Sequence, residues 1–437
     1  MDNLELQEYF TQGAMLAGQG RHAEAIKYYE RAEKLDPMNE DVYLAKGIAY
    51  ANLDELDAAK AQFEKALKVN RTSGLAWYHL GRIAILQGNS ALGYEDYNKA
   101  IANGYDDAQV YYSIGLLNEE QGDREMAIRN YSKAIMRDAL RPDIRVRKAR
   151  LLLQGGNTDE ALQTLDEMIL TNPDVFEGYH LKFTILLQTG DYDRADAVLD
   201  DAIALFPKDP AFVLDRVNLR TDQGKLDEAL ALLTELEGRE ETDSDVRRKI
   251  NMQRAQIFAA QENLDAAIAA LEKAKTVADQ AGVFDTDVVF LLTNCQLAKE
   301  NFAAALEGVE CLLEKAPDGY IKQTALYLKP FALKKLERME EAIPLYKEAI
   351  NTYRRQSLET PENLDAYLLR IMCLRDLEQY DKAMELANYI ADLQPERPEP
   401  HVLRASILQA QGLEEEAKAE SQLAERKMDR KQNGASR

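Results

Sequence analysis

The chain has 437 residues, with 54 Lys and Arg against 76 Asp and Glu, which gives a formal net charge of −22. This negative charge disfavours binding to nucleic acid or to an anionic membrane surface. No segment approaches the roughly 18 consecutive apolar residues of a membrane-spanning helix, so we expect no direct membrane insertion.

The composition predicts helix nearly throughout, because Ala, Leu, Glu and Lys are abundant and only 12 Pro and 22 Gly occur. The first ten residues, MDNLELQEYF, contain neither a basic segment nor an apolar run, so no signal peptide is expected. The three cysteines, Cys295, Cys311 and Cys373, lack CxxC and Cys/His spacings, which is typical of reduced thiols in a cytosolic protein. We therefore expect a cytoplasmic protein.

A period of 34 residues runs through the first half of the chain. A fixed period of this length indicates stacked helix–turn–helix units. In the first helix of a unit a small residue follows a bulky one by four positions, as Gly47 follows Tyr43. In the second helix a bulky residue lies between two small ones, as Phe63 lies between Ala59 and Ala66. The first small residues of the second helices are Ala25, Ala59, Gly93, Ala127, Ala161, Ala195 and Ala229.

Seven regular units are expected over residues 6–243, and five less regular units over residues 244–431. The later units are expected at 248–281, 286–319, 323–356, 364–397 and 398–431. Longer second helices or linker turns would absorb the insertions between them. Pro330 occupies the small-residue position of the tenth unit and argues against a regular helix there. Residues 432–437 are expected to form a disordered tail.

These spacings resemble the tetratricopeptide repeat, and twelve such repeats would cover residues 6–431. The resemblance implies an all-α fold, a right-handed α-solenoid superhelix of stacked helix–turn–helix repeats. First helices would line its concave face and second helices its convex face. The implied function is a protein–protein interaction scaffold that binds a peptide or partner helix in the concave groove, with the chain as a monomer.

Two other functions are open from the sequence. One is a regulatory or sensor subunit, and the other is a recruiting subunit of a larger membrane or glycosyltransferase assembly. Catalysis is not expected, because no HExxH, GxxxxGK[ST] or GxSxG motif occurs. The four histidines fall in different repeats and lack metal-ligand spacing, so we expect no metal and no cofactor.

The resemblance also places a groove, because the family uses the second, fifth, sixth, ninth, twelfth and thirteenth repeat positions for its concave face. A basic segment, RDALRPDIRVRKAR at 137–150, accompanies these positions and contains six basic and two acidic residues. The reversed local charge predicts an acidic peptide or C-terminal carboxylate as ligand, held by arginine forks. The predicted groove residues of repeats three to six are Tyr78, His79, Arg82, Tyr112, Leu116, Arg147, Arg150 and His180.

A structural interpretation of the cations competes with this one. The seventh repeat position is basic in eight of the twelve units, so these side chains could simply pack their stems and pair with carboxylates. The seventh-position cations are Lys46, Lys148, Lys182, Arg216, Arg254, Lys329, Arg370 and Arg404.

Chaperone-binding members of the family hold a carboxylate with a clamp of Lys, Asn and Arg residues. Only Arg147 of this chain matches that pattern, so we do not expect binding of a chaperone tail.

The C-terminal half predicts a different, apolar groove for an amphipathic partner helix, in which methionine supplies adaptable contacts. The alternative is that the same residues belong to the ordinary core between repeats. The residues concerned are Met252, Phe290, Tyr327, Phe331 and Met372.

Overall fold

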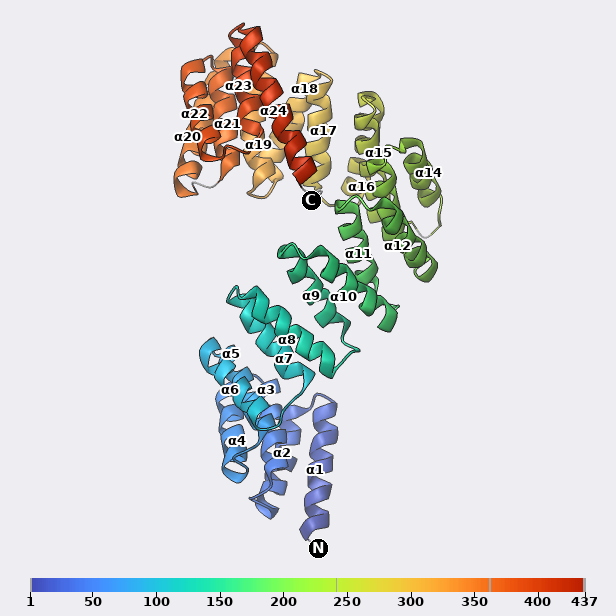
Figure 1. Ribbon diagram of the computed structural model, residues 1–437, viewed down its shortest axis with the longest axis vertical. Helices are drawn as coiled ribbons and strands as arrows, with labels where there is room; N and C mark the ends of the chain where they lie inside the picture. The colour runs from blue at the N-terminus through green and yellow to red at the C-terminus, as the bar shows by residue number, and fades with distance from the viewer. Residues whose placement is uncertain (1, 241, 361–362, 435–437) are drawn as a thin grey trace. The chain divides into compact units, whose positions relative to one another are not determined.

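The computed structural model describes residues 2–240, 242–360 and 363–434, and these residues form 24 α-helices and no β-strand (Figure 1). The number agrees with twelve helix pairs. Contacts divide the chain into two compact units, unit 1 (Met1–Ile185) and unit 2 (Leu186–Arg437). The division falls inside α11 (Phe176–Gln188).

Odd-numbered helices are the first helices of the repeats, and even-numbered helices are the second. Unit 1 contains most of α11 together with α1 (Asp2–Gly18), α2 (His22–Leu35), α3 (Glu40–Asn52), α4 (Leu56–Val69), α5 (Gly74–Leu86), α6 (Ser90–Ala102), α7 (Ala108–Glu120), α8 (Arg124–Arg137), α9 (Pro142–Gln154) and α10 (Thr158–Thr171). Unit 2 contains α12 (Tyr192–Leu205), α13 (Ala211–Asp222), α14 (Leu226–Glu237), α15 (Ser244–Ala260), α16 (Leu264–Gln280), α17 (Thr286–Ala298), α18 (Phe302–Lys315), α19 (Tyr320–Lys335), α20 (Met339–Glu359), α21 (Leu364–Asp376), α22 (Tyr380–Leu393), α23 (Glu399–Ala410) and α24 (Glu414–Gly434).

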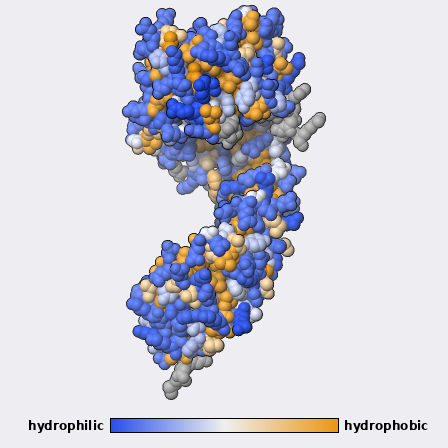
Figure 2. Space-filling view, turned by 90° about the vertical axis from the view of Figure 1, so that its left-hand side faces the viewer, coloured by the Kyte–Doolittle hydropathy of each residue, from blue (hydrophilic) through white to orange (hydrophobic). Residues whose placement is uncertain are grey.

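The small residues of the repeat allow the two helices of a pair to approach closely. A Cβ atom added to Gly47 in α3 would lie 2.6 Å from the ring of Phe63 in α4, which is fully buried. Gly115 in α7 meets Tyr131 in α8 in the same way, at 2.5 Å. Apolar side chains form successive clusters along each unit, because each helix packs mainly on its neighbours in the chain. Figure 2 shows mostly hydrophilic side chains on the visible face, with apolar ones in narrower strips.

The turn inside a repeat contains a residue with a left-handed backbone. Glycine adopts this conformation without a Cβ clash, as at Gly88 with φ 80°. Five repeats instead use an acidic residue with φ near 60°: Asp54 in unit 1, and Glu262, Glu300, Glu337 and Glu378 in unit 2. At the start of several first helices, the side chain of the N-cap residue accepts a hydrogen bond from a backbone N–H group of the first turn. Ser73, for example, accepts a hydrogen bond from the backbone N–H of Ala76.

The helix boundaries show how the irregular repeats accommodate their extra residues. Two insertions lengthen second helices, since α16 has 17 residues and α20 has 21, compared with 14 in α4. First helices also lengthen, and α15 begins at Ser244, before the expected start at 248. The doubt about Pro330 was wrong, because it lies inside the continuous helix α19. The expected disordered tail began at 432, but α24 extends to Gly434, and residues 435–437 lie outside the described residues.

Other features of the described residues bear on the predicted chemistry. None of the helices formed by residues 2–240, 242–360 and 363–434 has the length and apolarity needed to span a bilayer. Within the same ranges no three His, Cys, Asp or Glu side chains are grouped so as to hold a metal ion. All three cysteines are unpaired, and burial raises the pKa of the Cys295 and Cys373 thiols.

Candidate functional site

Unit 1 contains a pocket of about 410 Å³ between α5, α6 and α7. Two of the predicted groove residues, Tyr78 and Arg82, line it from α5. Tyr97, Gln109 and Ser113 complete its polar lining from α6 and α7. Side chains from the first helices of two successive repeats, α5 and α7, therefore line one cavity.

Two tyrosines that line the pocket, Tyr78 and Tyr97, belong to a stack of aromatic rings. The ring centroid of Tyr78 lies 5.6 Å from that of Tyr97 and 4.9 Å from that of Tyr105. Burial raises the pKa of the Tyr97 and Tyr105 hydroxyls to about 12, and it also raises the pKa of Tyr78. At neutral pH these hydroxyls stay protonated. The hydroxyls of Tyr78 and Tyr97, which line the pocket, can donate hydrogen bonds to a ligand, but they are poorly suited to act as bases.

Arg82 is the free cation of this pocket. Its guanidinium lies 6.0 Å from the centroid of the Tyr78 ring, within cation–π range, and its side chain is exposed. Among the residues that the structure describes, none forms an ion pair with Arg82. Arg82 can therefore accept an anionic group without first giving up a carboxylate partner.

His79 is a correction to the predicted groove. Its side chain is only 9% exposed, and its ring stacks on Phe63 with 4.8 Å between centroids and 6° between planes. Burial, followed by the nearby charge of Arg82, lowers the pKa of His79 to about 4. The side chain is a neutral part of the core at physiological pH and does not reach the pocket lining.

The remaining arginines of the predicted groove have partners. Arg147 lies 3.6 Å from a carboxylate oxygen of Glu119, which also accepts a hydrogen bond of 2.6 Å from the Tyr131 hydroxyl. Arg150 pairs with Glu177 in α11. The structure therefore gives Arg147 and Arg150 carboxylate partners, and it does not bring them into the Arg82 pocket.

The other cations of the basic segment at 137–150 also have partners. Arg137 pairs with Asp106 at 2.9 Å, and Arg141 pairs with Asp143 at 2.7 Å. Arg145 is buried and donates to the backbone carbonyl of Ala139. Most of the positive charges in this segment are therefore paired with carboxylates or carbonyl groups of the protein itself.

Three predicted groove residues lie outside the Arg82 pocket lining. Tyr112 and Leu116 in α7 are half-buried, and the guanidinium of Arg141 covers the Tyr112 ring at 5.3 Å. His180 in α11 is exposed, with its ring 6.0 Å from that of Phe176. The predicted groove residues included neither Gln109 nor Ser113, although both occupy groove positions, the second and sixth, of the fourth repeat.

In the predicted apolar groove of unit 2, most of the residues are packed into the core. Tyr327 is 3% exposed and donates a hydrogen bond of 2.9 Å to Asp376. Phe290, Phe331 and Met372 are half-buried against the same core cluster. Met252 lies outside that cluster, and its sulfur accepts a hydrogen bond from Arg248. The structure thus favours packing between repeats over an open apolar groove.

The seventh-position cations form a series of ion pairs across adjacent helices. Lys46 in α3 is buried and donates to Glu33 in α2 at 2.8 Å. Six further seventh-position cations also have carboxylate partners, which is the structural interpretation of the sequence pattern. These pairs are Lys148–Glu160, Lys182–Asp166, Arg216–Asp200, Arg254–Glu237, Lys329–Glu310 and Arg404–Glu420.

Comparison with known proteins agrees with the helix pairs and their spacing. Four family profiles, each described as a tetratricopeptide or TPR repeat, match the chain at 13–54, 44–108, 119–182, 186–251, 249–280 and 332–398. The chain belongs to the tetratricopeptide-repeat family. Proteins with these repeats serve as interaction scaffolds that bind other proteins or peptides.

Several curated proteins contain similar segments. Anaphase-promoting complex subunit 3 of Schizosaccharomyces pombe is 28% identical over 156 residues, which is 36% of this chain and 24% of that protein. BBSome complex member BBS4 of Bos taurus is 34% identical over 82 residues, or 19% of this chain and 16% of that protein. The tetratricopeptide-repeat chain thus spans about a quarter or less of the length of these relatives.

Solved structures include similar helical repeats. The C-terminal part of a TPR repeat-containing protein from Cytophaga hutchinsonii is 16% identical, with a TM-score of 0.44, over 65% of this chain and 99% of that one. A structure of Naa15/Naa10 bound to HypK-THB is also 16% identical, with a TM-score of 0.37, over 95% of this chain and 67% of that one.

Proposed function

We propose that this tetratricopeptide-repeat protein is a non-catalytic scaffold that binds an acidic peptide segment or C-terminus of a partner in the α5–α7 pocket. The observation that carries the proposal is Arg82, an exposed cation without an ion-pair partner among the described residues, placed over the Tyr78 ring. An arginine fork suits a carboxylate, and the tyrosine faces suit the flanking side chains of a peptide.

The lining of the pocket supports binding rather than bond-making chemistry. The amide of Gln109 and the hydroxyl of Ser113 can share hydrogen bonds with a peptide backbone, and neither is an activated nucleophile in the structure. The tyrosine hydroxyls stay protonated for the reason given above. This combination of one cation, neutral donors and aromatic faces is typical of peptide recognition.

The test is a selection of peptides with free C-termini on the full chain, followed by affinity measurements on the best binder. We expect Arg82→Gln to weaken binding at least tenfold, or about 1.4 kcal/mol, because a charge-assisted hydrogen bond is lost. Arg129→Gln is the matched control, because Arg129 is also exposed but lies on the second helix α8. Equal affinity of the Arg82→Gln variant and the parent would refute the proposal.

Salt provides a second readout. The pocket is open to water, so raising the ionic strength should weaken binding by the parent and have a smaller effect on the residual binding by Arg82→Gln. Circular dichroism of both variants should match the parent, because an exposed arginine contributes little to stability. If neither ionic strength nor Arg82→Gln changes the affinity, the ligand binds outside the α5–α7 pocket.

A further inference from the structure

One seventh-position cation departs from the series of ion pairs. Arg370 in α21 has neither a hydrogen bond nor an ion pair with any residue of the described ranges, and its buried Nε has no acceptor. The acidic partners of Lys182 and Arg216 lie sixteen residues earlier, at Asp166 and Asp200. Sixteen residues before Arg370 the chain has Arg354. Arg354, on the extended part of α20, therefore faces Arg370, whereas Lys182 and Arg216 face a carboxylate.

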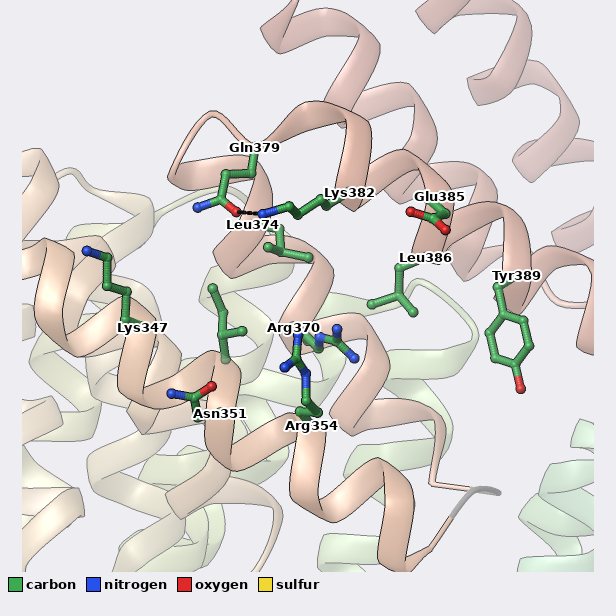
Figure 3. Close-up of a pocket in the computed structure, with 11 residues that line it drawn as sticks. Lys347, Asn351, Arg354, Arg370, Leu374, Gln379, Lys382, Glu385, Leu386 and Tyr389 are labelled. Atoms are coloured by element: carbon green, nitrogen blue, oxygen red, sulfur yellow. Dashed lines mark hydrogen bonds between the residues drawn. The ribbon is translucent and has the colours of Figure 1, made fainter.

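These arginines belong to a cavity of about 640 Å³ between α20, α21 and α22 (Figure 3). Two lysines, Lys347 and Lys382, also line the cavity, and Glu385 is its one acidic lining residue. Four cations against one carboxylate leave three positive charges in excess, in a chain whose formal net charge is −22. The cavity lies in unit 2 and is lined by residues of two second helices and one first helix, so it is a different site from the α5–α7 pocket of unit 1.

Arg370 and Arg354 interact unfavourably with each other. Burial, followed by the charge of Arg354, lowers the pKa of Arg370. An arginine nevertheless remains charged in proteins, so the repulsion cannot be relieved by loss of a proton. In Figure 3 the two guanidinium groups lie next to each other within the cavity. An anion between them would supply both the missing acceptor for Nε and the missing counter-charge.

The rest of the wall is apolar. Ile350, Leu374 and Leu386 line the cavity beside the cations, and Tyr389, which is 51% exposed, stands at one side of it. Lys382 donates a hydrogen bond of 3.0 Å to Gln379, so its ammonium is held at the cavity edge. A ligand that fits these walls combines an oxyanion with an aromatic or aliphatic body.

We propose that the cavity between α20, α21 and α22 binds a phosphate monoester whose organic group packs against its apolar wall. A phosphate dianion matches the excess of positive charge better than a single carboxylate does. Its three free oxygens can also accept hydrogen bonds from two guanidinium forks at once. The ester can come from a phosphorylated side chain of a partner or from a small phosphorylated molecule.

The primary test is calorimetric titration of the full chain with phenyl phosphate, inorganic phosphate and benzoate in phosphate-free buffer. Phenyl phosphate should bind saturably, at least tenfold more tightly than benzoate, which has the same ring but one negative charge. It should also bind several-fold more tightly than inorganic phosphate, which lacks the ring. Absence of saturable binding by phenyl phosphate overturns the proposal.

Variants locate the binding. Arg354→Gln and Arg370→Gln should each weaken phenyl phosphate at least tenfold. Arg355→Gln is the matched control on the same helix, because Arg355 is exposed and does not line the cavity. A uniform loss in all three variants would mean nonspecific attraction and would also overturn the proposal. Phenyl phosphate should raise the melting temperature of the parent but not of Arg354→Gln, a readout that requires only that the variant folds.

A further arm distinguishes the sources of the ester. Binding of both phenyl phosphate and a phosphotyrosyl peptide supports the proposal with a partner side chain as the source. Binding of phenyl phosphate alone supports it with a small molecule as the source. Arg82→Gln should leave the affinity for phenyl phosphate unchanged, so this proposal and the proposed peptide function of unit 1 can fail independently.

Discussion

The interface between α2 and α3 in unit 1 and the interface between α20 and α21 in unit 2 present the same repeat position with opposite neighbours. Lys46 is buried beside Glu33, whereas Arg370 faces Arg354. The repeat thus fixes where a cation stands, and the residue on the preceding helix determines its environment. With a carboxylate there, the charge joins two helices. With a second cation there, the charge remains available to a ligand.

The largest loss of stability should follow when the α2–α3 interface receives two facing cations, as at the α20–α21 interface. Glu33→Arg would place a cation against Lys46, which is 6% exposed, and against Lys65. We expect unit 1 to lose about 3 kcal/mol, because a largely buried charge loses its main partner. Trp77 in α5, the single tryptophan of the chain, reports on unit 1 by fluorescence during denaturation. Unchanged stability would contradict the structural role of the Lys46–Glu33 pair.

The same substitution at both interfaces should have opposite effects. Lys46→Met should cost about 1–2 kcal/mol, because the hydrogen-bonded contact with Glu33 is lost. Arg370→Met should instead raise stability by up to about 1 kcal/mol in phosphate-free buffer, because it removes a charge without a partner among the described residues. Calorimetry of each variant against the parent measures both. Destabilisation by both substitutions would show that Arg370 has a structural role.

An ion pair can also be introduced at the α20–α21 interface. Arg354→Glu should create the missing ion pair with Arg370 and stabilise unit 2 by about 1 kcal/mol, while abolishing the binding of phenyl phosphate. The melting temperature of the variant measures its stability, and calorimetric titration of the same sample measures its affinity for phenyl phosphate. Arg355→Glu is the control for the charge change alone, and equal gains from the two variants would argue against a specific pair.

The smallest expected effect is a pH dependence confined to the paired interface. Burial opposes ionisation of Glu33, but hydrogen bonds from Lys46 and Lys65 outweigh it and lower the pKa of Glu33 below its ordinary value of 4.5. The unfolded carboxyl therefore binds a proton at higher pH than the folded one. The stability advantage of the parent over Glu33→Gln, about 0.5–1 kcal/mol, should be complete above that value and decrease below it. Denaturation series at pH 7 and pH 4 measure it.

Much of the fold could be predicted because the repeat encodes helix contacts at fixed spacing. A small residue such as Gly47 has to face a bulky one such as Phe63, so the helix pairs of the regular repeats follow from their period. The lengths of the irregular helices could not be predicted from the same alignment. An insertion after the last small contact can extend a helix or form a loop, and α20 extends its helix to Glu359.

The pockets were less predictable, because their properties depend on contacts between repeats. The groove positions predict that Tyr78 and Arg82 line a surface, but burial of His79 depends on the ring of Phe63 in the preceding repeat. The second pocket had no comparable signal in the sequence. Sixteen residues before a seventh-position cation the chain has an acidic residue in three repeats only, Glu30, Asp166 and Asp200, and Arg354 lies on an extension of α20 that shifts this register.

The acidic residues in the left-handed turns have a consequence for engineering thermostability. A side chain in this backbone conformation costs roughly 1 kcal/mol, and glycine removes the clash while increasing the freedom of the unfolded chain. Exchange of one of these turn residues for glycine should therefore yield a net gain of about 0.5 kcal/mol. The five sites, Asp54, Glu262, Glu300, Glu337 and Glu378, lie in separate repeats, so the gains should add. Because none of the five lines the α5–α7 pocket or the α20–α22 cavity, heat resistance can be adjusted in increments independently of ligand affinity.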